Sequence, residues 1–217
     1  MTTKEFTVFD TPRGFVRGSS GLYAPMQVHP DTNDLLVAQG LPEYAEITRL
    51  GGGYSAMATA AVAALVVRPT TVAMATLHNN ESLSGKTLII DEAFAHNLVG
   101  TANSVYSIWL CLHPVGMAAP TNDITVRNSH SGKVGNGTTK TIFDNGATVL
   151  NDGWFPWSLS EHTVTITTPG GVIIAPVKGR LLVPPTAGIS LHVVADVVGA
   201  TFTAGFRWFE KVLTVVT

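Results

Sequence analysis

The chain has 217 residues, of which 13 are Lys or Arg and 15 are Asp or Glu. This charged share of 13% is about half of the roughly 25% usual for a soluble globular domain, and the mean hydropathy is +0.27. Such a composition excludes a disordered chain, which needs low hydrophobicity and high net charge. It also excludes a nucleic-acid binder that displaces counterions with a basic surface. The single cysteine, Cys111, excludes an internal disulfide and a cysteine-based zinc site.

Residues 1–68 are predicted to form an N-terminal arm or subdomain that mediates assembly by wrapping on a neighbour. Pro and Gly recur every few residues, which leaves room for short extended pieces but not for a long helix. Short helical turns are expected over residues 31–39 and 41–47, whereas residues 54–67 are equally compatible with helix and strand. The first residues lack the basic and apolar regions of a secretory signal. Residues 50–67 are uncharged but rich in Gly and Ala, so we expect no membrane span.

Residues 69–217 are predicted to form an antiparallel β-sandwich. Val and Thr dominate this part, as expected of pleated, half-buried strands. Short strands that recur at intervals of roughly 10 to 15 residues, with no helical period between them, best fit a jelly roll. The fold class is therefore all-β, a jelly-roll-like sandwich with an extended N-terminal arm. The predicted strands cover residues 71–78, 86–95, 104–113, 123–128, 140–143, 161–168, 172–176, 178–183, 189–198 and 201–209.

Alternation assigns the two faces of the last strands. Leu191, Val193, Ala195 and Val197 should point into the core, with His192 and Asp196 outward. One face of the final strand carries Phe202, Ala204, Phe206 and Trp208, so Phe209 lies on the opposite face and needs a cover of its own. In the strand at 104–113, Trp109 and Cys111 oppose the apolar face formed by Tyr106, Ile108, Leu110 and Leu112, which predicts that this strand is covered on both sides.

No motif for catalysis or for a metal or cofactor survives a test of its spacing. Residues 80–87 approach a phosphate-binding loop, but Asn80 replaces the first glycine and a strand follows where a helix is needed. A hairpin turn is the better interpretation. The histidines show no metal-ligand spacing, and no Gly-x-Ser-x-Gly elbow occurs. Glu161 with His162, and His192 with Asp196, are interpreted as surface residues, and Cys111 as inert packing.

Low charge and clustered aromatics point instead to contacts between proteins. Net charge is −2, and a net charge near zero promotes association. Three uncharged stretches, at 50–67, 93–122 and 162–177, suggest that much of the surface is buried against other subunits. Aromatic side chains are enriched at the cores of such interfaces. The expected interface residues are Phe6, Phe9, Phe15 and Tyr23 of the arm, and Trp154, Phe155, Trp157 and Phe209 of the sandwich.

Two stretches resemble the terminal strand pairs of a known family. They are Gly179 to Asp196 (GRLLVPPTAGISLHVVAD) and Thr201 to Glu210 (TFTAGFRWFE). Together with the Thr, Val, Ala and Gly-rich composition of residues 70–212, they are similar to trimeric jelly-roll virion proteins of bacteriophages. The resemblance implies a capsid decoration (cement) or coat protein, found in the virion and assembled in the host cytoplasm. It further implies a homotrimer with other capsid proteins as partners, and carries over no functional residue.

Two alternatives stay open at this point. A carbohydrate- or receptor-binding sandwich would use Trp154 and Trp157 as a platform for a glycan. A cupin- or glycosidase-like enzyme would need a histidine-rich metal cluster or a pair of carboxylates from separate strands. The histidine cluster is missing, and the sequence alone does not test the carboxylate pair.

Overall fold

The computed structural model describes residues 15–17, 23–25, 44–100, 104–121, 124–135, 140–149, 153–162 and 171–213. The chain divides into two units, Met1–Glu43 and Tyr44–Thr217. In the first unit, β1 (Phe15–Arg17) pairs in antiparallel fashion with β2 (Tyr23–Pro25). The short helix expected over residues 31–39 lies outside the described residues.

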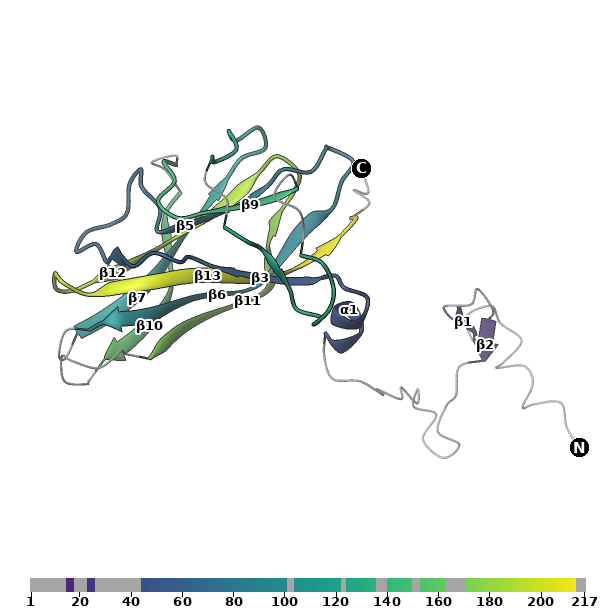
Figure 1. Cartoon of the computed structure of the whole chain (residues 1–217), viewed down its shortest axis with the longest axis horizontal. Helices are drawn as coiled ribbons and strands as arrows, with labels where there is room; N and C mark the ends of the chain where they lie inside the picture. The colour runs from purple at the N-terminus through teal and green to yellow at the C-terminus, as the bar shows by residue number, and fades with distance from the viewer. Residues whose placement is uncertain are drawn as a thin grey trace, which may run out of the picture. The chain divides into compact units, whose positions relative to one another are not determined.

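Two antiparallel sheets packed against each other make up the second unit (Figure 1). The five-stranded sheet has the order β10, β7, β12, β5, β9, and the other sheet has the order β11, β6, β13, β3, β8, with β4 also paired to β13. The strands are β3 (Gly53–Met57), β4 (Val62–Ala63), β5 (Ala75–Asn79), β6 (Thr87–Val99), β7 (Ser104–His113), β8 (Arg127–Asn128), β9 (Thr141–Asp144), β10 (Phe155–His162), β11 (Val172–Val183), β12 (Gly188–Ala195) and β13 (Thr201–Lys211).

The strand pairs are nested along the chain. Strand β3 pairs with β13, β5 with β12, β6 with β11, and β7 with β10, all antiparallel. With the short strands β4, β8 and β9 set aside, the first strand of the sandwich thus pairs with the last, the second with the second-last, and so on. This is the order of a long two-stranded ribbon rolled into two four-stranded sheets. The expected jelly-roll-like β-sandwich is confirmed. The short strands β8 and β9 lie between β7 and β10 in the chain and extend the two sheets next to β3 and β5.

The sandwich begins earlier than the sequence suggested. Its unit starts at Tyr44, so that residues 44–68, assigned above to the arm, form α1 (Ala45–Arg49), β3 and β4. The segment 54–67, compatible with helix or strand, is drawn into a sheet by a partner about 150 residues away: β3 pairs with β13 over Gly53–Met57. There Tyr54 is buried, and its ring stacks on Trp208 with centroids 6.1 Å apart.

The main core lies between the sheets and uses most of the faces that alternation assigned, but Leu112, assigned to the apolar face of β7, is 40% exposed. Phe202 and Phe206 of β13 are fully buried and meet aromatic rings of the opposite sheet edge to face. Their partners are Tyr106 of β7, at 5.0 Å between centroids, and Phe143 of β9, at 6.3 Å. Val197, expected to point inward, lies past the end of β12 and is 36% exposed.

Two strands differ in extent from the prediction, for a local reason. The segments expected at 172–176 and 178–183 form one strand, β11, with a register shift between Pro176 and Leu181. Pro176 is tolerated because β11 is an edge strand, and Lys178 (φ 51°) and Gly179 (φ 74°) accommodate the bulge. Strand β10 begins at Phe155 instead of residue 161. The turn expected around residues 80–87 connects β5, which ends at Asn79, to β6, which begins at Thr87. The expectation of a hairpin is wrong, because these two strands belong to different sheets and the turn crosses from one sheet to the other.

Side chains of β10 seal the edge of the sandwich at β11. The Trp157 indole Nε1 donates a hydrogen bond to the Pro176 carbonyl at 3.1 Å, and the Ser158 hydroxyl donates one to the Ile174 carbonyl at 3.2 Å. Both carbonyls belong to the edge strand, whose free acceptors would otherwise offer a template for another strand. These two hydrogen bonds make strand addition at this part of β11 less favourable.

Candidate functional site

The eight aromatic residues expected at an interface differ in where they lie and in how far they are buried. Phe6 and Phe9 lie outside the described residues, while Phe15 and Tyr23 belong to the two paired strands of the first unit. Trp154 is 4% exposed and packs in a small second core with Cys111 and Val149. Its indole Nε1 donates to the Thr70 carbonyl at 2.6 Å. Trp154 is thus covered by its own chain, and a two-tryptophan platform for a glycan is not presented.

The other three aromatic residues of the sandwich that were expected at an interface, Phe155, Trp157 and Phe209, are half-buried. Phe155 and Trp157 pack against the main core, with their ring centroids 5.8 Å apart. Phe209 lies on the outer face of its sheet, as expected, and its cover is Tyr44, stacked on it at 4.7 Å just before α1. Each of these rings has intramolecular packing, so a role for them between copies stays a prediction.

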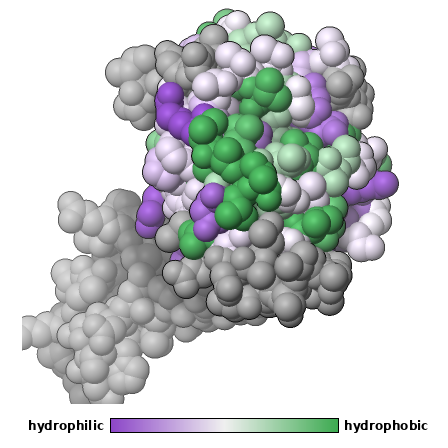
Figure 2. Space-filling model, turned by 90° about the vertical axis from the view of Figure 1, so that its left-hand side faces the viewer, coloured by the Kyte–Doolittle hydropathy of each residue, from purple (hydrophilic) through white to green (hydrophobic). Residues whose placement is uncertain are grey.

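Exposed apolar residues gather instead at one end of the sandwich, and we name them the valine cluster: Val66, Val67, Val99, Val197 and Val198. Their exposed fractions are 46%, 64%, 50%, 36% and 75%. Figure 2 shows an apolar cluster on this face of the molecule.

Pairing brings the valine cluster together from three segments. Val99 pairs with Thr201, and Leu65, next to Val66, bridges to Val194 of β12. Val197 and Val198 lie in the turn between β12 and β13. Isolated exposed valines are common, but a contiguous apolar patch is typical of an interaction site. Sequence analysis missed this cluster because its members are far apart in the chain and residues 62–67 were assigned to the arm.

The outer face of the five-stranded sheet carries a row of buried polar side chains. Ser190 on β12 lies directly between Cys111 on β7 and Thr76 on β5. Its hydroxyl is 2.9 Å from the Thr76 hydroxyl and 2.7 Å from His113 Nε2, and all four residues are at most 4% exposed. The Ser190 to His113 distance suits a nucleophile and its base. Because Ser190 has no exposed surface, a substrate has no access to it, and the row serves as an internal hydrogen-bond network.

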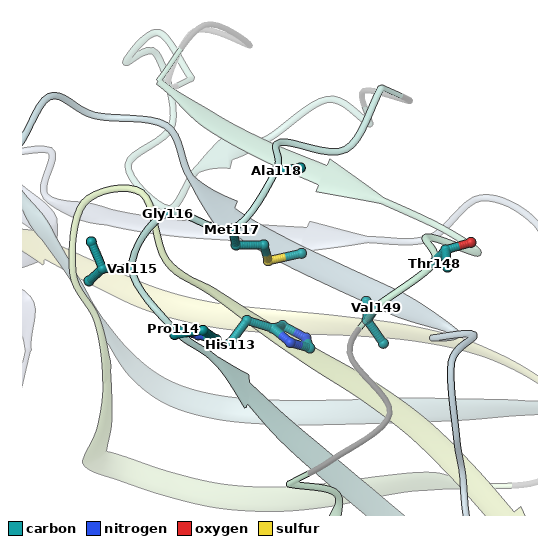
Figure 3. Close-up of a pocket in the computed structure, with 8 residues that line it drawn as sticks. All are labelled: His113, Pro114, Val115, Gly116, Met117, Ala118, Thr148 and Val149. Atoms are coloured by element: carbon teal, nitrogen blue, oxygen red, sulfur yellow. The ribbon is translucent and has the colours of Figure 1, made fainter.

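A pocket of about 500 Å³ opens next to this row. Figure 3 shows the His113 ring beneath the Met117 side chain, with Thr148 and Val149 across from them. The lining is mostly apolar, and His113 is the one ionisable side chain among the eight residues that form it. The pocket can hold a small apolar group, but its geometry assigns no chemistry.

Two buried histidines, His78 and His192, flank this row and carry a pH dependence. The interpretation of His192 as a surface residue is wrong, because it is 3% exposed. His78 Nε2 donates to the Met117 carbonyl at 3.3 Å, and His78 Nδ1 is buried without a hydrogen-bond partner among the described residues. His192 Nδ1 donates to the Val193 carbonyl at 2.9 Å, and its ring meets Trp154 edge to face at 6.5 Å. Burial lowers the pKa of both imidazoles below the usual value of a histidine.

We expect this burial to destabilise the fold in acid. With a lowered pKa in the folded state, the unfolded chain binds more protons below about pH 6.5. The free energy of unfolding is therefore unaffected by these two histidines above that pH. Below it, the free energy of unfolding falls by at most about 1.4 kcal/mol per pH unit for each group. Urea unfolding at pH 7.5, 6.0 and 5.0 measures the slope, and the double variant His78→Gln, His192→Gln should show a shallower one. Equal slopes for the two proteins would contradict the assignment.

Within the described ranges, no group of three His, Cys, Asp or Glu side chains could hold a metal ion. Among the same residues, no helix is long and apolar enough to cross a membrane.

No model of a known protein family matches the chain, and no curated protein matches its sequence. Evidence on the function of this protein therefore comes from the surfaces of the sandwich described above.

Proposed function

We propose that the protein is a virion structural protein, a capsid decoration (cement) or coat component that acts by packing against copies of itself and against other capsid proteins. The valine cluster carries this proposal. A monomer gains nothing from exposing five valines at one end of a rigid sandwich, whereas burying them against a second apolar surface contributes roughly 25 cal/mol for each Å² removed from water. The nested sandwich supplies a rigid body that presents this end.

A closed assembly with the valine cluster at its symmetry axis buries this one surface in every copy. Most soluble oligomers are closed and symmetric. Three copies around an axis at the valine cluster would form the homotrimer that the sequence resemblance implies. Edge-to-edge assembly through β11 is less favourable near Ile174 and Pro176, because Ser158 and Trp157 already donate to the carbonyl groups of these two residues. The low charge of the chain is consistent with burial of more surface in a larger shell.

The test is the native mass of the purified protein and of a matched pair of variants. Val198→Asp places a charge in the valine cluster, and Val134→Asp places the same charge at a site that is 89% exposed in another loop. We expect three-chain mass by light scattering for the wild type and for Val134→Asp. Val198→Asp should weaken association at least about tenfold, since burying an unpaired carboxylate is costly. Closed shells in electron micrographs of the wild type would indicate a coat role, and trimers alone a decorating role. A wild-type monomer at high concentration would overturn the proposal.

A further inference from the structure

Two arginines flank a pocket on the outer face of the six-stranded sheet. Arg207 of β13 pairs with Ser55 of β3, and Ser55 pairs with Arg127 of β8. Residues directly opposite each other in antiparallel strands share a face, and neighbouring strands lie about 4.8 Å apart. The two arginine side chains therefore start about 10 Å apart on either side of Ser55. We call the hollow between them, of about 410 Å³, the arginine pocket; its lining includes Ser55, Thr59, Phe94, Thr125, Arg127 and Arg207.

The chemistry of the arginine pocket suits a carboxylate. The Arg207 guanidinium lies over the Phe94 ring, 5.0 Å from its centroid, and one of its nitrogens is 2.6 Å from Glu92 Oε1. This leaves further N–H groups of Arg207, because a guanidinium has five. Arg127 is exposed, and in the described part of the chain it takes part in no ion pair. The hydroxyls of Ser55, Thr59 and Thr125 add neutral donors at the rim.

The chain contains a segment of complementary charge. Residues 1–43 hold three Lys and Arg against five Asp and Glu, whereas residues 44–217 hold ten of each, so the net charge of −2 belongs to the first unit. Within it, residues 26–43 carry Asp31, Asp34 and Glu43 and no Lys or Arg. Three apolar residues, Leu35 to Val37, follow Asp34 directly and could lie on the exposed apolar surface beside the pocket, at Met57 and Ile174.

We infer that the arginine pocket binds the acidic segment 26–43 of a neighbouring copy of this chain. The inference rests on the proposed function, because it needs copies held in one assembly. Extended, the segment spans up to about 60 Å, which is enough to reach a neighbouring sandwich. The segment directly precedes Tyr44, the first residue of the sandwich unit, so its reach is measured from that point. The carboxylates of Asp31 and Asp34 bind between Arg127 and Arg207, and each copy thereby gives and receives one segment.

Cross-linking between full-length chains tests the inference. Asn33→Cys sits between the two aspartates and keeps both, and Thr125→Cys sits in the arginine pocket at an exposed position. The native Cys111 is fully buried and does not interfere. The two single variants, carrying different tags, are co-expressed and oxidised. We expect a disulfide-linked heterodimer on a non-reducing gel. A matched control replaces Thr125→Cys with Leu83→Cys, which is also exposed, lies in the turn before β6 and is outside the pocket.

The outcomes separate this inference from the proposal on which it rests. Heterodimer yield with Thr125→Cys should exceed that with Leu83→Cys, and adding Arg127→Glu to the Thr125→Cys chain should lower the yield about tenfold, because like charges are then opposed. Equal yields for the two cysteine positions would overturn the inference. So would a cross-link that forms only within a single chain carrying both Asn33→Cys and Thr125→Cys. Light scattering on the same wild-type sample distinguishes the cases: a trimer without the cross-link removes only the segment exchange, and a monomer removes the proposed function as well.

Discussion

Replacing Phe206 with alanine is expected to lower the free energy of unfolding by about 4 kcal/mol. Phe206 is fully buried at the centre of the core. Its ring meets Phe143 of the opposite sheet edge to face, at 6.3 Å, so that the substitution opens a cavity at the place where the two sheets join. Such a loss is a large part of the roughly 5–15 kcal/mol that stabilises a typical domain.

Chemical denaturation followed by tryptophan fluorescence measures the effect of Phe206→Ala. Phe206→Leu keeps most of the volume and should cost only about 1–1.5 kcal/mol, which preserves a folded protein for the comparison if the alanine variant fails to fold. Val134→Ala, at an 89% exposed position, should change stability by less than about 0.5 kcal/mol. A cost for Phe206→Ala similar to that of Val134→Ala would show that the sheets are not packed through this ring.

The sandwich was predictable from sequence because its signal is local. Alternation within a single strand was enough to place Phe202, Phe206 and Trp208 on the buried face of β13 and to give the bounds of β7 as the structure has them. The start of the sandwich was not predictable in this way. Strand β3 is rich in small residues and lacks a clear period, and its place in the sheet depends on pairing with β13 at the other end of the chain.

The candidate surfaces were less accessible to prediction, because each is assembled from several strands. Ser190 meets His113 and Thr76 only once three strands are in register, and the arginine pocket needs the pairing of β13, β3 and β8. The surroundings of Trp154 also depend on distant residues. Its indole Nε1 donates to the Thr70 carbonyl, a contact that the local sequence around residue 154 does not indicate.

Gly205→Ala is expected to destabilise the protein by about 3 kcal/mol, although it adds a single methyl group. Gly205 lies in the middle of β13, between Phe94 of β6 and Met57 of β3. A Cβ there would overlap the backbone carbonyl oxygen of Ala56 and would approach the tip of the Phe94 ring, Cζ, at 2.6 Å. Strand β3 must therefore move away from β13, and the Phe94 ring beside the arginine pocket must turn. Gly171→Ala is the matched control, because a Cβ at Gly171 meets nothing within 4 Å, and it should be nearly neutral.

A double-mutant cycle separates the two clashes at Gly205. Phe94→Ala removes the ring and leaves the Ala56 carbonyl in place. If the ring is the main obstacle, Gly205→Ala in the Phe94→Ala background should cost much less than it does alone. If the carbonyl dominates, the cost should be the same in both backgrounds, since backbone cannot rotate away as a ring can. We expect the second result, because the overlap with the carbonyl is the closer of the two. A stability equal to that of Gly171→Ala would mean that β3 does not approach β13 as closely as the structure places it.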